Sequence, residues 1–495
     1  MIRSFFPIGV LTLGLLTAQV VSFIHVYLSN ADLYDTLMAI NHAGFLTVPN
    51  RQIMESLRQF SPAFFGGLFF TFTSGAALSI FTLGAVWMWH GSLSRNRYFS
   101  ALFLIIWLGG IVGVNNGGFN PLATSLFITV PAAVTAAALK WRPIQNGKKP
   151  FAKGIVFFTP FILLTAFWLL QLDSRMFLNF RDNLFLSNPL GIKINDFYYK
   201  YTLYPAEILK SMEQKLIKTC DFESIQDVSL KTSLEKILLP HDYVSIGHRS
   251  AADLKILKDG DALVFKNPAK VILRTPIRTF FLQPKTTLMK ISLKTDRNLS
   301  FRSFTFASLL IGLPLIAYIY LYALFYYLSS CFLDAMAAGG IASVVCFIIG
   351  TAILMPAYLE KKKEVHVEAL TDALASEDWQ YRVAGLKVLL ENNMEIADFQ
   401  PYERIMNSPH IPERYWFVRA LGISRKPETY DRLLGFLDDP CPNVVCMVFR
   451  SLGQRQDRTA VKEIVHRIKT SDHWYEQWYA YKALRALGWK QTRLN

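Results

Sequence analysis

Residue types that carry catalytic chemistry are present in this chain, but they do not converge on one site. His241 and Asp242 are adjacent and His248 follows, and an imidazole beside a carboxylate is a common general-base pairing. No serine or cysteine stands in a nucleophile motif near them, and no metal-ligand spacing is present. Since such a pair on a turn is normally solvated, we expect no catalytic residue, no metal ion and no cofactor.

The cysteines and the histidines of the apolar segments lead to the same expectation. The five cysteines form no CxxC or CxxCH motif, so we expect buried or lipid-facing thiols at Cys220, Cys331, Cys346, Cys441 and Cys446. His25 and His90 stand near opposite ends of two apolar segments, which places them roughly 30 Å apart across a bilayer. They cannot ligate one haem, and we interpret both as interfacial histidines.

Seven apolar segments dominate the chain up to residue 358. Hydrophobic residues make up 52% of the sequence and charged residues 18%, and the charges fall between the segments. The segments are residues 5–28, 63–89, 99–114, 122–139, 154–172, 304–328 and 335–358. Because a helix needs about 20 apolar residues to cross a bilayer, we predict a multi-pass α-helical membrane protein with about seven spans. The first segment is longer than the apolar core of a signal peptide, so we expect a retained anchor.

The distribution of charge narrows the function. The net charge of +15 is typical of a membrane protein whose loops lie near lipid headgroups, and we do not expect nucleic acid as a partner. The interiors of the seven segments contain no Asp, Glu, Lys or Arg. Pumps and ion-coupled transporters generally need such groups inside the bilayer. A transport or channel subunit is therefore the second hypothesis rather than the first.

Basic residues in short loops give an orientation. They gather at one end of the predicted spans, at Arg95, Arg97, Lys140, Arg142, Lys148, Lys149 and Lys153. Positive short loops mark the cytoplasmic face, so residues 173–303 and 359–495 share the opposite, external face of the cell (plasma or inner) membrane. Lys361, Lys362 and Lys363 pull against this assignment, but long translocated domains largely escape the charge rule.

Small and polar residues recur at helical spacing within the apolar segments. Gly109, Gly113 and Gly117 are four apart, and Gly339 and Ser343 repeat the pattern near the end of the chain's apolar part. Small residues let helices approach closely in lipid, so we predict intramolecular helix packing, with a homo-oligomer interface as the alternative. A stripe of Thr and Ser between residues 71 and 82 predicts hydrogen bonds between helices; the alternative is the lining of a pathway.

Residues 173–303 predict a small soluble α+β domain. The segments 252–257 and 262–266 flank Lys258-Asp259-Gly260-Asp261, which is a hairpin signal, and 271–274 and 288–294 complete a small sheet. A helix is expected from Pro205, with an apolar face that continues to Ile217. From Lys266 to Arg302 there are nine Lys or Arg and a single acid, Asp296. We expect residues 266–302 to contact anionic lipid headgroups; an acidic partner is the second alternative.

The segment after residue 359 contains internal repeats. Leu389, Leu421, Leu452 and Leu487 are spaced 32, 31 and 35, and the last three precede a glycine. A second series, Leu374, Met406, Leu437 and Ile468, is spaced 32, 31 and 31. Two series that keep step predict repeated helix pairs. The longer last spacing predicts a four-residue insertion between the helices of the fourth unit.

Residues 365–490 resemble the short HEAT-like repeats of the phycobilisome-lyase type, whose units read as an acidic turn, Val-Arg, an alanine-rich helix and Leu-Gly. Arg382 and Arg414 match the arginine of that pattern, whereas Val445 and Ala480 depart from it. The resemblance implies an α-solenoid and a protein-binding role, and no enzymatic residues carry over. We recognise no family in residues 1–360. The domains expected are 1–172 (five spans), 173–303 (soluble α+β), 304–358 (two spans) and 359–495 (repeats).

Aromatic residues of the repeats are the candidate partner-binding residues. They are Trp379, Trp416, Trp474, Tyr475 and Trp478, and the last three lie in the predicted insertion, where we expect them to be exposed. The leading hypothesis is a membrane-anchored scaffold or assembly protein that presents a helical-repeat docking surface to another protein. A transport or channel subunit is second, and a membrane enzyme is third.

Overall fold

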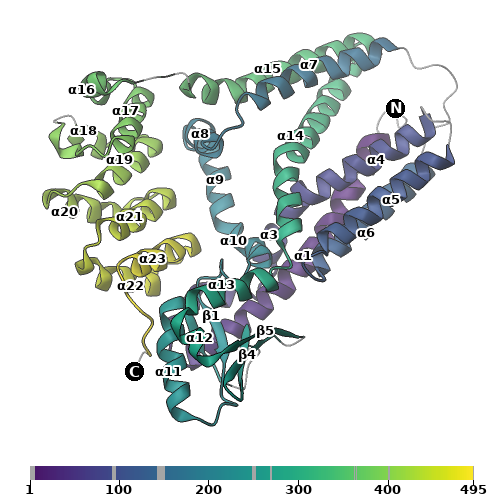
Figure 1. Cartoon of the computed structure of the whole chain (residues 1–495). Coiled ribbons are helices and arrows are strands. Elements are labelled where there is room, and N and C mark those ends of the chain that lie inside the picture. Colours follow the sequence, from purple (N-terminus) through teal and green to yellow (C-terminus); the bar gives the residue numbers. More distant parts are fainter. Residues whose placement is uncertain are drawn as a thin grey trace.

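The computed structural model describes residues 6–91, 96–141, 151–247, 252–267, 270–361, 363, 365–399 and 402–493 (Figure 1). Of the side chains in these ranges, those of residues 91, 151–155, 361, 402 and 403 are not described. Several residues used above fall outside the described part: Arg95, Arg142, His248, Lys148, Lys149 and Lys362, and the side chains of Lys153 and Lys361.

Six helices within the described residues are long and apolar enough to cross a membrane. They are α1 (Phe6–His42), the continuous run α3 (Phe60–Phe70), η2 (Thr71–Gly75) and α4 (Ala76–Gly91), then α5 (Arg97–Val114), α6 (Pro121–Lys140), α14 (Leu299–Ser330) and α15 (Ala335–Lys361). The expected fifth span is α7 (Phe151–Leu169), whose described apolar part, Val156–Leu169, is shorter. A mostly helical chain with several apolar helices is confirmed, and a seventh span stays a prediction.

The polar stripe of the second apolar segment is packed inside the helix bundle. Thr71 donates to the Gln19 side chain of α1 at 2.7 Å, and the hydroxyls of Ser74 and Thr305 on α14 lie 3.1 Å apart. At Gly75 an added Cβ would lie 2.4 Å from the Cβ of Ala18, so α1 and η2 are in close contact there. Thr71 and Ser74 therefore join helices, as predicted, and the lining of a pathway stays an untested alternative.

Small residues take part in close helix contacts at only some of the expected positions. Ser343 donates to the Val156 carbonyl at 2.5 Å, and a Cβ at Gly339 would lie 3.4 Å from the Tyr322 hydroxyl. A Cβ at Gly117 would lie 2.6 Å from the Asp296 carbonyl, although Gly117 is in the turn after α5 rather than on the helix.

The expected packing of Gly109 and Gly113 is wrong within this chain. Apart from the adjacent residues and the backbone of α5 itself, no atom of the described residues lies within 4 Å of a Cβ built at either position. The face of α5 that meets α6 is one residue away, at Gly110, where a Cβ would lie 3.0 Å from the Phe127 ring. The spacing of the glycines predicts that they share one face of the helix, but it does not predict whether that face points toward α6.

A five-stranded sheet follows the fifth apolar helix. Its strands are β1 (Lys218–Asp221), β2 (Tyr243–Ser245), β3 (Leu254–Asp259), β4 (Ala262–Lys266) and β5 (Val271–Pro276), in the order β2-β1-β3-β4-β5. The predicted hairpin is present as antiparallel β3 and β4, and β5 extends it; β1 runs parallel to both β2 and β3. Helices α11 (Val228–Leu238), α12 (Ile277–Leu282) and α13 (Pro284–Thr295) accompany the sheet.

Two local predictions in this region are wrong. Residues 288–294 form part of helix α13, because Pro284 suits a first helical turn and the buried Leu288 and Ile291 are three apart, as on one helix face. The helix around Pro205, α10 (Leu203–Leu209), ends at Leu209, well before Ile217.

The C-terminal part is a stack of four helix pairs. Each pair has a short first helix and a longer second helix: α16 (Leu370–Ala375) and α17 (Trp379–Glu391), α18 (Tyr402–Met406) and α19 (Ile411–Ile423), α20 (Glu428–Gly435) and α21 (Pro442–Arg455), α22 (Val461–Thr470) and α23 (Trp474–Ala486). Successive second helices pack against each other, from α17 to α23. The predicted α-solenoid is therefore confirmed.

The expected insertion in the fourth unit is wrong. Three residues, Ser471, Asp472 and His473, separate α22 from α23. The third pair also has three residues between Asp438 and the start of α21, so the fourth unit contains no extra residues there. Leu484, on α23, is the residue equivalent to Leu452, while Leu487 lies past the helix end. The Leu-Gly pair at 487–488 matches the repeat pattern by coincidence. Alignment on it misplaced the predicted register of the fourth unit by three residues.

Between the apolar bundle and the solenoid runs a chain of short helices. It consists of α8 (Met176–Phe180), η3 (Arg181–Phe185), α9 (Pro189–Tyr201) and α10, and we call it the connecting rod. A small helix, α2 (Arg51–Ser56), follows the long α1 nearby. In Figure 1 the sheet and the solenoid both lie away from the N-terminal end of the bundle.

Candidate interaction surface of the repeats

The middle of the solenoid is fixed to the connecting rod. The Trp416 indole nitrogen on α19 donates to the Asp182 carboxylate at 2.8 Å, and Asp182 also pairs with its neighbour Arg181 at 2.6 Å. The Arg181 guanidinium lies 3.7 Å from the centre of the Tyr415 ring. Trp416 is 6% exposed, so this predicted partner-binding residue is not a free surface aromatic.

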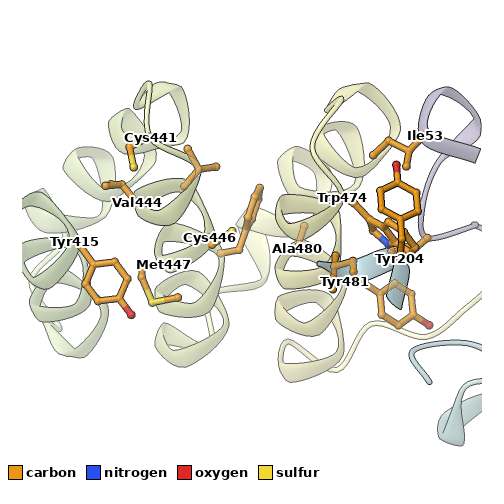
Figure 2. Packing of buried hydrophobic residues seen from close by; sticks show 14 of the residues in the cluster. Ile53, Tyr204, Tyr415, Cys441, Val444, Cys446, Met447, Trp474, Ala480 and Tyr481 are labelled. Atoms are coloured by element: carbon orange, nitrogen blue, oxygen red, sulfur yellow. The ribbon is translucent and has the colours of Figure 1, made fainter. Parts of the chain in front are cut away.

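The last repeat is fixed to the C-terminal end of the connecting rod, at α10. The Trp474 ring meets the Tyr204 ring edge-on at 5.0 Å, and both belong to the same buried cluster as Ile53 (Figure 2). The Tyr475 hydroxyl is 2.9 Å from the Thr202 hydroxyl. Trp474 is 6% exposed, so its expected exposure is wrong: α10, far away in sequence, covers it.

The turn before α2 is bound by the same repeat. The Asn50 amide nitrogen donates to the carbonyls of Ile468, Lys469 and Ser471 at 3.1, 3.1 and 2.9 Å. The Asn50 backbone NH donates to the Gln477 side chain at 2.7 Å. One asparagine thus satisfies carbonyls at the end of α22 that the helix itself leaves open.

At the other end of the solenoid the first repeat is fixed to α15. Glu360, at the end of α15, forms an ion pair with Lys387 on α17 and accepts a hydrogen bond from Asn183 at 2.7 Å. Asn183 in turn accepts from the Gln380 amide at 2.9 Å. Glu360 and Asn183 are both buried, so the solenoid is attached at its two ends and its middle.

The remaining predicted aromatics are partly buried. Trp379 stacks on His410 of the next repeat, with ring centres 5.1 Å apart. Trp478 lies under Lys482, whose ammonium is 3.6 Å from the centre of the ring. The structure does not bring the five aromatics into one exposed patch, and their binding of a partner stays a prediction.

Arginines in the first turn of the second helices link successive repeats. Arg382 forms a bidentate ion pair with the fully buried Glu413 of the next unit, and Arg414 pairs with Asp439 at 2.7 Å. In the structural register the fourth unit has Gln477 at this position, not Ala480, and Gln477 donates to the Ser471 carbonyl at 2.7 Å, as the arginines do to their own turns. In the first, second and fourth units this position therefore ties the helix pair to its neighbour or to Asn50, whereas the third unit has Val445 there.

A row of cations occupies one position in all four second helices. The ninth residue of α17, α19, α21 and α23 is Lys387, Arg419, Arg450 and Lys482, at spacings of 32, 31 and 32. We call this row the cation ladder. The spacing of these four cations can be read from the sequence. The predicted register of the fourth unit was wrong by three residues, so Lys482 was not recognised as equivalent to the other three.

The cations of the ladder influence one another. Burial lowers the pKa of Arg419, and the positive charges of Arg450 and Arg181 add to the shift. Burial likewise lowers the pKa of Lys482, with contributions from Lys210 and Arg450. Consecutive rungs are thus close enough to repel, which favours an anion beside them.

A cavity of about 580 Å³ lies where the bundle, the sheet domain and the last repeat meet. Its walls include Leu28 and Leu122 of the bundle together with Trp474 and Trp478. The charged residues that line it are mostly paired with each other, as Lys210 is with Glu207 and Lys215 with Asp253.

The residues that suggested catalytic chemistry in the sequence have other contacts in the structure. No group of three or more His, Cys, Asp or Glu there is placed to hold a metal ion. Asp242, which stood out beside His241, accepts a hydrogen bond from Tyr481 at 2.6 Å and pairs with Arg485 at 2.9 Å. Its role in the structure is to fix the sheet domain to α23.

Comparison with known proteins identifies part of the solenoid. No curated protein and no solved structure matches the chain. A family model described as HEAT repeats matches residues 401–485, which spans the second helix pair to the fourth. Arg414 and the stacked second helices α19, α21 and α23 lie in the matched part. Residues 401–485 are therefore HEAT repeats.

Proposed function

We propose that the chain is a membrane-anchored interaction protein whose HEAT-repeat solenoid binds another protein. The observation that carries this proposal is the attachment of the solenoid along its length to α15, the connecting rod and Asn50. Buried polar contacts of this kind hold a domain in one orientation. A repeat surface held rigidly beside apolar helices suits the assembly of a partner at a membrane, and HEAT repeats generally mediate protein–protein interaction.

The packing of the bundle favours this function over transport. The Thr and Ser stripe, which suggested a pathway, is buried between α1, η2 and α14, and its residues do not line the cavity described above. A transport or channel subunit therefore loses its main supporting observation. A homo-oligomer stays a prediction, for which the open face of α5 at Gly109 and Gly113 is available.

We further propose that α12 and α13 lie on an anionic lipid surface. Leu282 and Leu293 are 73% and 65% exposed, and exposed lysines, Lys285, Lys290 and Lys294, alternate with them. The apolar helix α14 begins four residues after α13 ends. Exposed leucines interleaved with lysines are typical of a helix at the headgroup level.

A polarity-sensitive fluorophore tests the lipid contact. The full chain, with Cys331 replaced, is labelled at Leu293→Cys and placed in nanodiscs with anionic lipid. We expect a blue-shifted emission there and water-like emission for the same label at Val271→Cys, an exposed apolar residue on β5. Charge reversal of the three lysines should reverse the shift. Equal emission from both sites would rule out the contact.

The orientation of the membrane protein can be tested with single cysteines near Asp259 and Asp457. We propose that both lie on one face, the external one, so a membrane-impermeant reagent should label both from outside. Labelling of the two from opposite sides would remove α14 or α15 from the set of spans.

The interaction role is tested by purification from native membranes in a mild detergent. We expect one protein partner in a fixed stoichiometry that is lost when residues 365–495 are deleted. Flux of a solute through vesicles that contain the isolated chain, with no partner recovered, would reject the proposal and favour transport.

A further inference from the structure

The cation ladder has three rungs with no counter-ion. Arg419, Arg450 and Lys482 form no hydrogen bond or ion pair with any other residue in the described part of the chain. Arg450 and Lys482 are exposed, and Arg419 is half-buried. Since repeat stacking places these like charges side by side, the row is held against its own repulsion, and the acid close to Arg419, Asp182, is itself paired with Arg181.

Aromatic side chains lie against three of the four cations of the ladder. The Arg419 guanidinium lies 4.4 Å and the Lys387 ammonium 5.1 Å from the centre of the Trp416 ring, and Lys482 stacks on Trp478. A cation held over a ring face is presented in a defined direction. The two tryptophans therefore support the ladder.

The first rung already has an anion, and that anion is a carboxylate. Lys387 is paired with Glu360 from the end of α15. Glu360 is thus an example, within this chain, of the ligand that the ladder accepts. The other three rungs repeat the same position on the next three helices without an equivalent acid.

We propose that Arg419, Arg450 and Lys482 bind an acidic segment of the partner protein in the polyproline II conformation, with an acid at every third residue. Packed helices lie about 8–10 Å apart, so successive rungs have that spacing. A polyproline II chain turns once in about three residues and rises about 9.3 Å per turn, which brings every third side chain to one face. A segment of about seven residues reaches all three rungs.

The spacing favours a peptide over nucleic acid. A nucleic acid strand carries a phosphate about every 3.4 Å along the duplex axis, much denser than one cation per helix. The Glu360 carboxylate paired with Lys387 also favours an acidic peptide as the ligand. This inference rests on the proposed function and names the chemistry of the partner.

Binding is measured with the full chain in nanodiscs of zwitterionic lipid. The probe is a fluorescent nonapeptide of three Glu-Pro-Pro units, compared by anisotropy with a permuted peptide that has its three acids adjacent. We expect the regular peptide to bind at least about fivefold more tightly, because only it matches the rungs. The double variant R450E/K482E should weaken its binding by about tenfold or more.

A matched variant controls for general electrostatics. K462E/K469E changes the charge equally but lies on α22, the first helix of the fourth pair, where both lysines are exposed. We expect it to bind the regular peptide within about twofold of the unmodified chain. R450Q/K482Q, with an unchanged melting temperature, separates loss of binding from loss of folding.

Three results would overturn the inference: equal losses in the two charge-reversed variants, equal binding of the two peptides, or tighter ladder-dependent binding of an oligonucleotide of equal charge. If R450E/K482E loses the peptide but still recovers the native partner, the acidic-segment inference fails while the proposed function stands. If no partner is recovered from any variant or from the unmodified chain, the proposed function itself fails.

Discussion

Replacing Asn50 with alanine should loosen the attachment of the last repeat to the turn that follows α1. The Asn50 amide nitrogen donates to three carbonyls at the end of α22 and its oxygen accepts from the Ile53 NH at 3.2 Å. Asn50 is 6% exposed, so water replaces these partners poorly. The change removes the side-chain contacts and leaves the backbone bond to Gln477 without its support.

The size of the effect follows from these bonds. A hydrogen bond contributes about 1 kcal/mol net, and a buried carbonyl left without a donor costs about 1–3 kcal/mol. The three carbonyls share one nitrogen, so their contributions do not add fully. We expect the free energy of local opening to fall by about 3 kcal/mol, which corresponds to about a 100-fold faster amide exchange.

Hydrogen exchange of the full chain in nanodiscs measures this opening. Peptides that cover residues 46–54 and 464–478 should lose protection, while α17 and α19 keep theirs. Asn392→Ala is the matched control, because Asn392 is an exposed asparagine of the same domain with one bond to its own helix, to the Val388 carbonyl. Unchanged exchange around Asn50, or equal changes in both variants, would show that this contact does not hold the repeat.

Further predictions concern stability. Trp474→Ala should lower the free energy of unfolding by about 3–5 kcal/mol, since it empties a buried site against Tyr204; a melting temperature unchanged from the native chain would mean that the residue is free. Glu413→Ala leaves the buried Arg382 without its partner and should cost about 3–5 kcal/mol in denaturant unfolding, whereas a neutral result would contradict the buried pair. Burial raises the pKa of Glu476 above its unfolded value, so its contribution to stability is fully present below the unfolded pKa and is lost as the pH rises through the folded pKa. Melting of Glu476→Gln across that window should lack this loss, and a pH profile identical to that of the native chain would refute the assignment.

Sequence periodicity predicted what depends on neighbouring residues and missed what depends on distant ones. The apolar helices, the β3–β4 hairpin and the stacked helix pairs each follow from local patterns such as the spacing of Leu389, Leu421 and Leu452. The burial of Trp474 could not be predicted, because Tyr204 and Ile53 are hundreds of residues away along the chain. The rotation of α5, which turns Gly109 outward, is also set by packing between helices rather than by spacing.

The register of the fourth repeat shows how one local coincidence hides a functional pattern. An alignment on Leu487 places Arg485 at the ninth-residue position of the fourth unit, and the equivalence of Lys482 with Arg450 is lost. The structure restores it, because α23 begins at Trp474 and Lys482 is its ninth residue. Two independent signals, helix bounds and charge period, then agree on one row.

The use of the second helices by the chain itself limits where a partner can bind. On α19 and α21 the contacts with the connecting rod fall within the first six residues, at Tyr415, Trp416 and Asn443. The ladder residues of the same helices, Arg419 and Arg450, come later and have no hydrogen-bond partner among the described residues. The first turns of α19 and α21 thus attach the solenoid to the connecting rod, and the following turn of each helix carries a cation of the ladder. The rod also comes close to the ladder, since the charges of Arg181 and Asp182 act on the pKa of Arg419, and that of Lys210 acts on the pKa of Lys482. A partner segment bound to the ladder would therefore lie beside the rod.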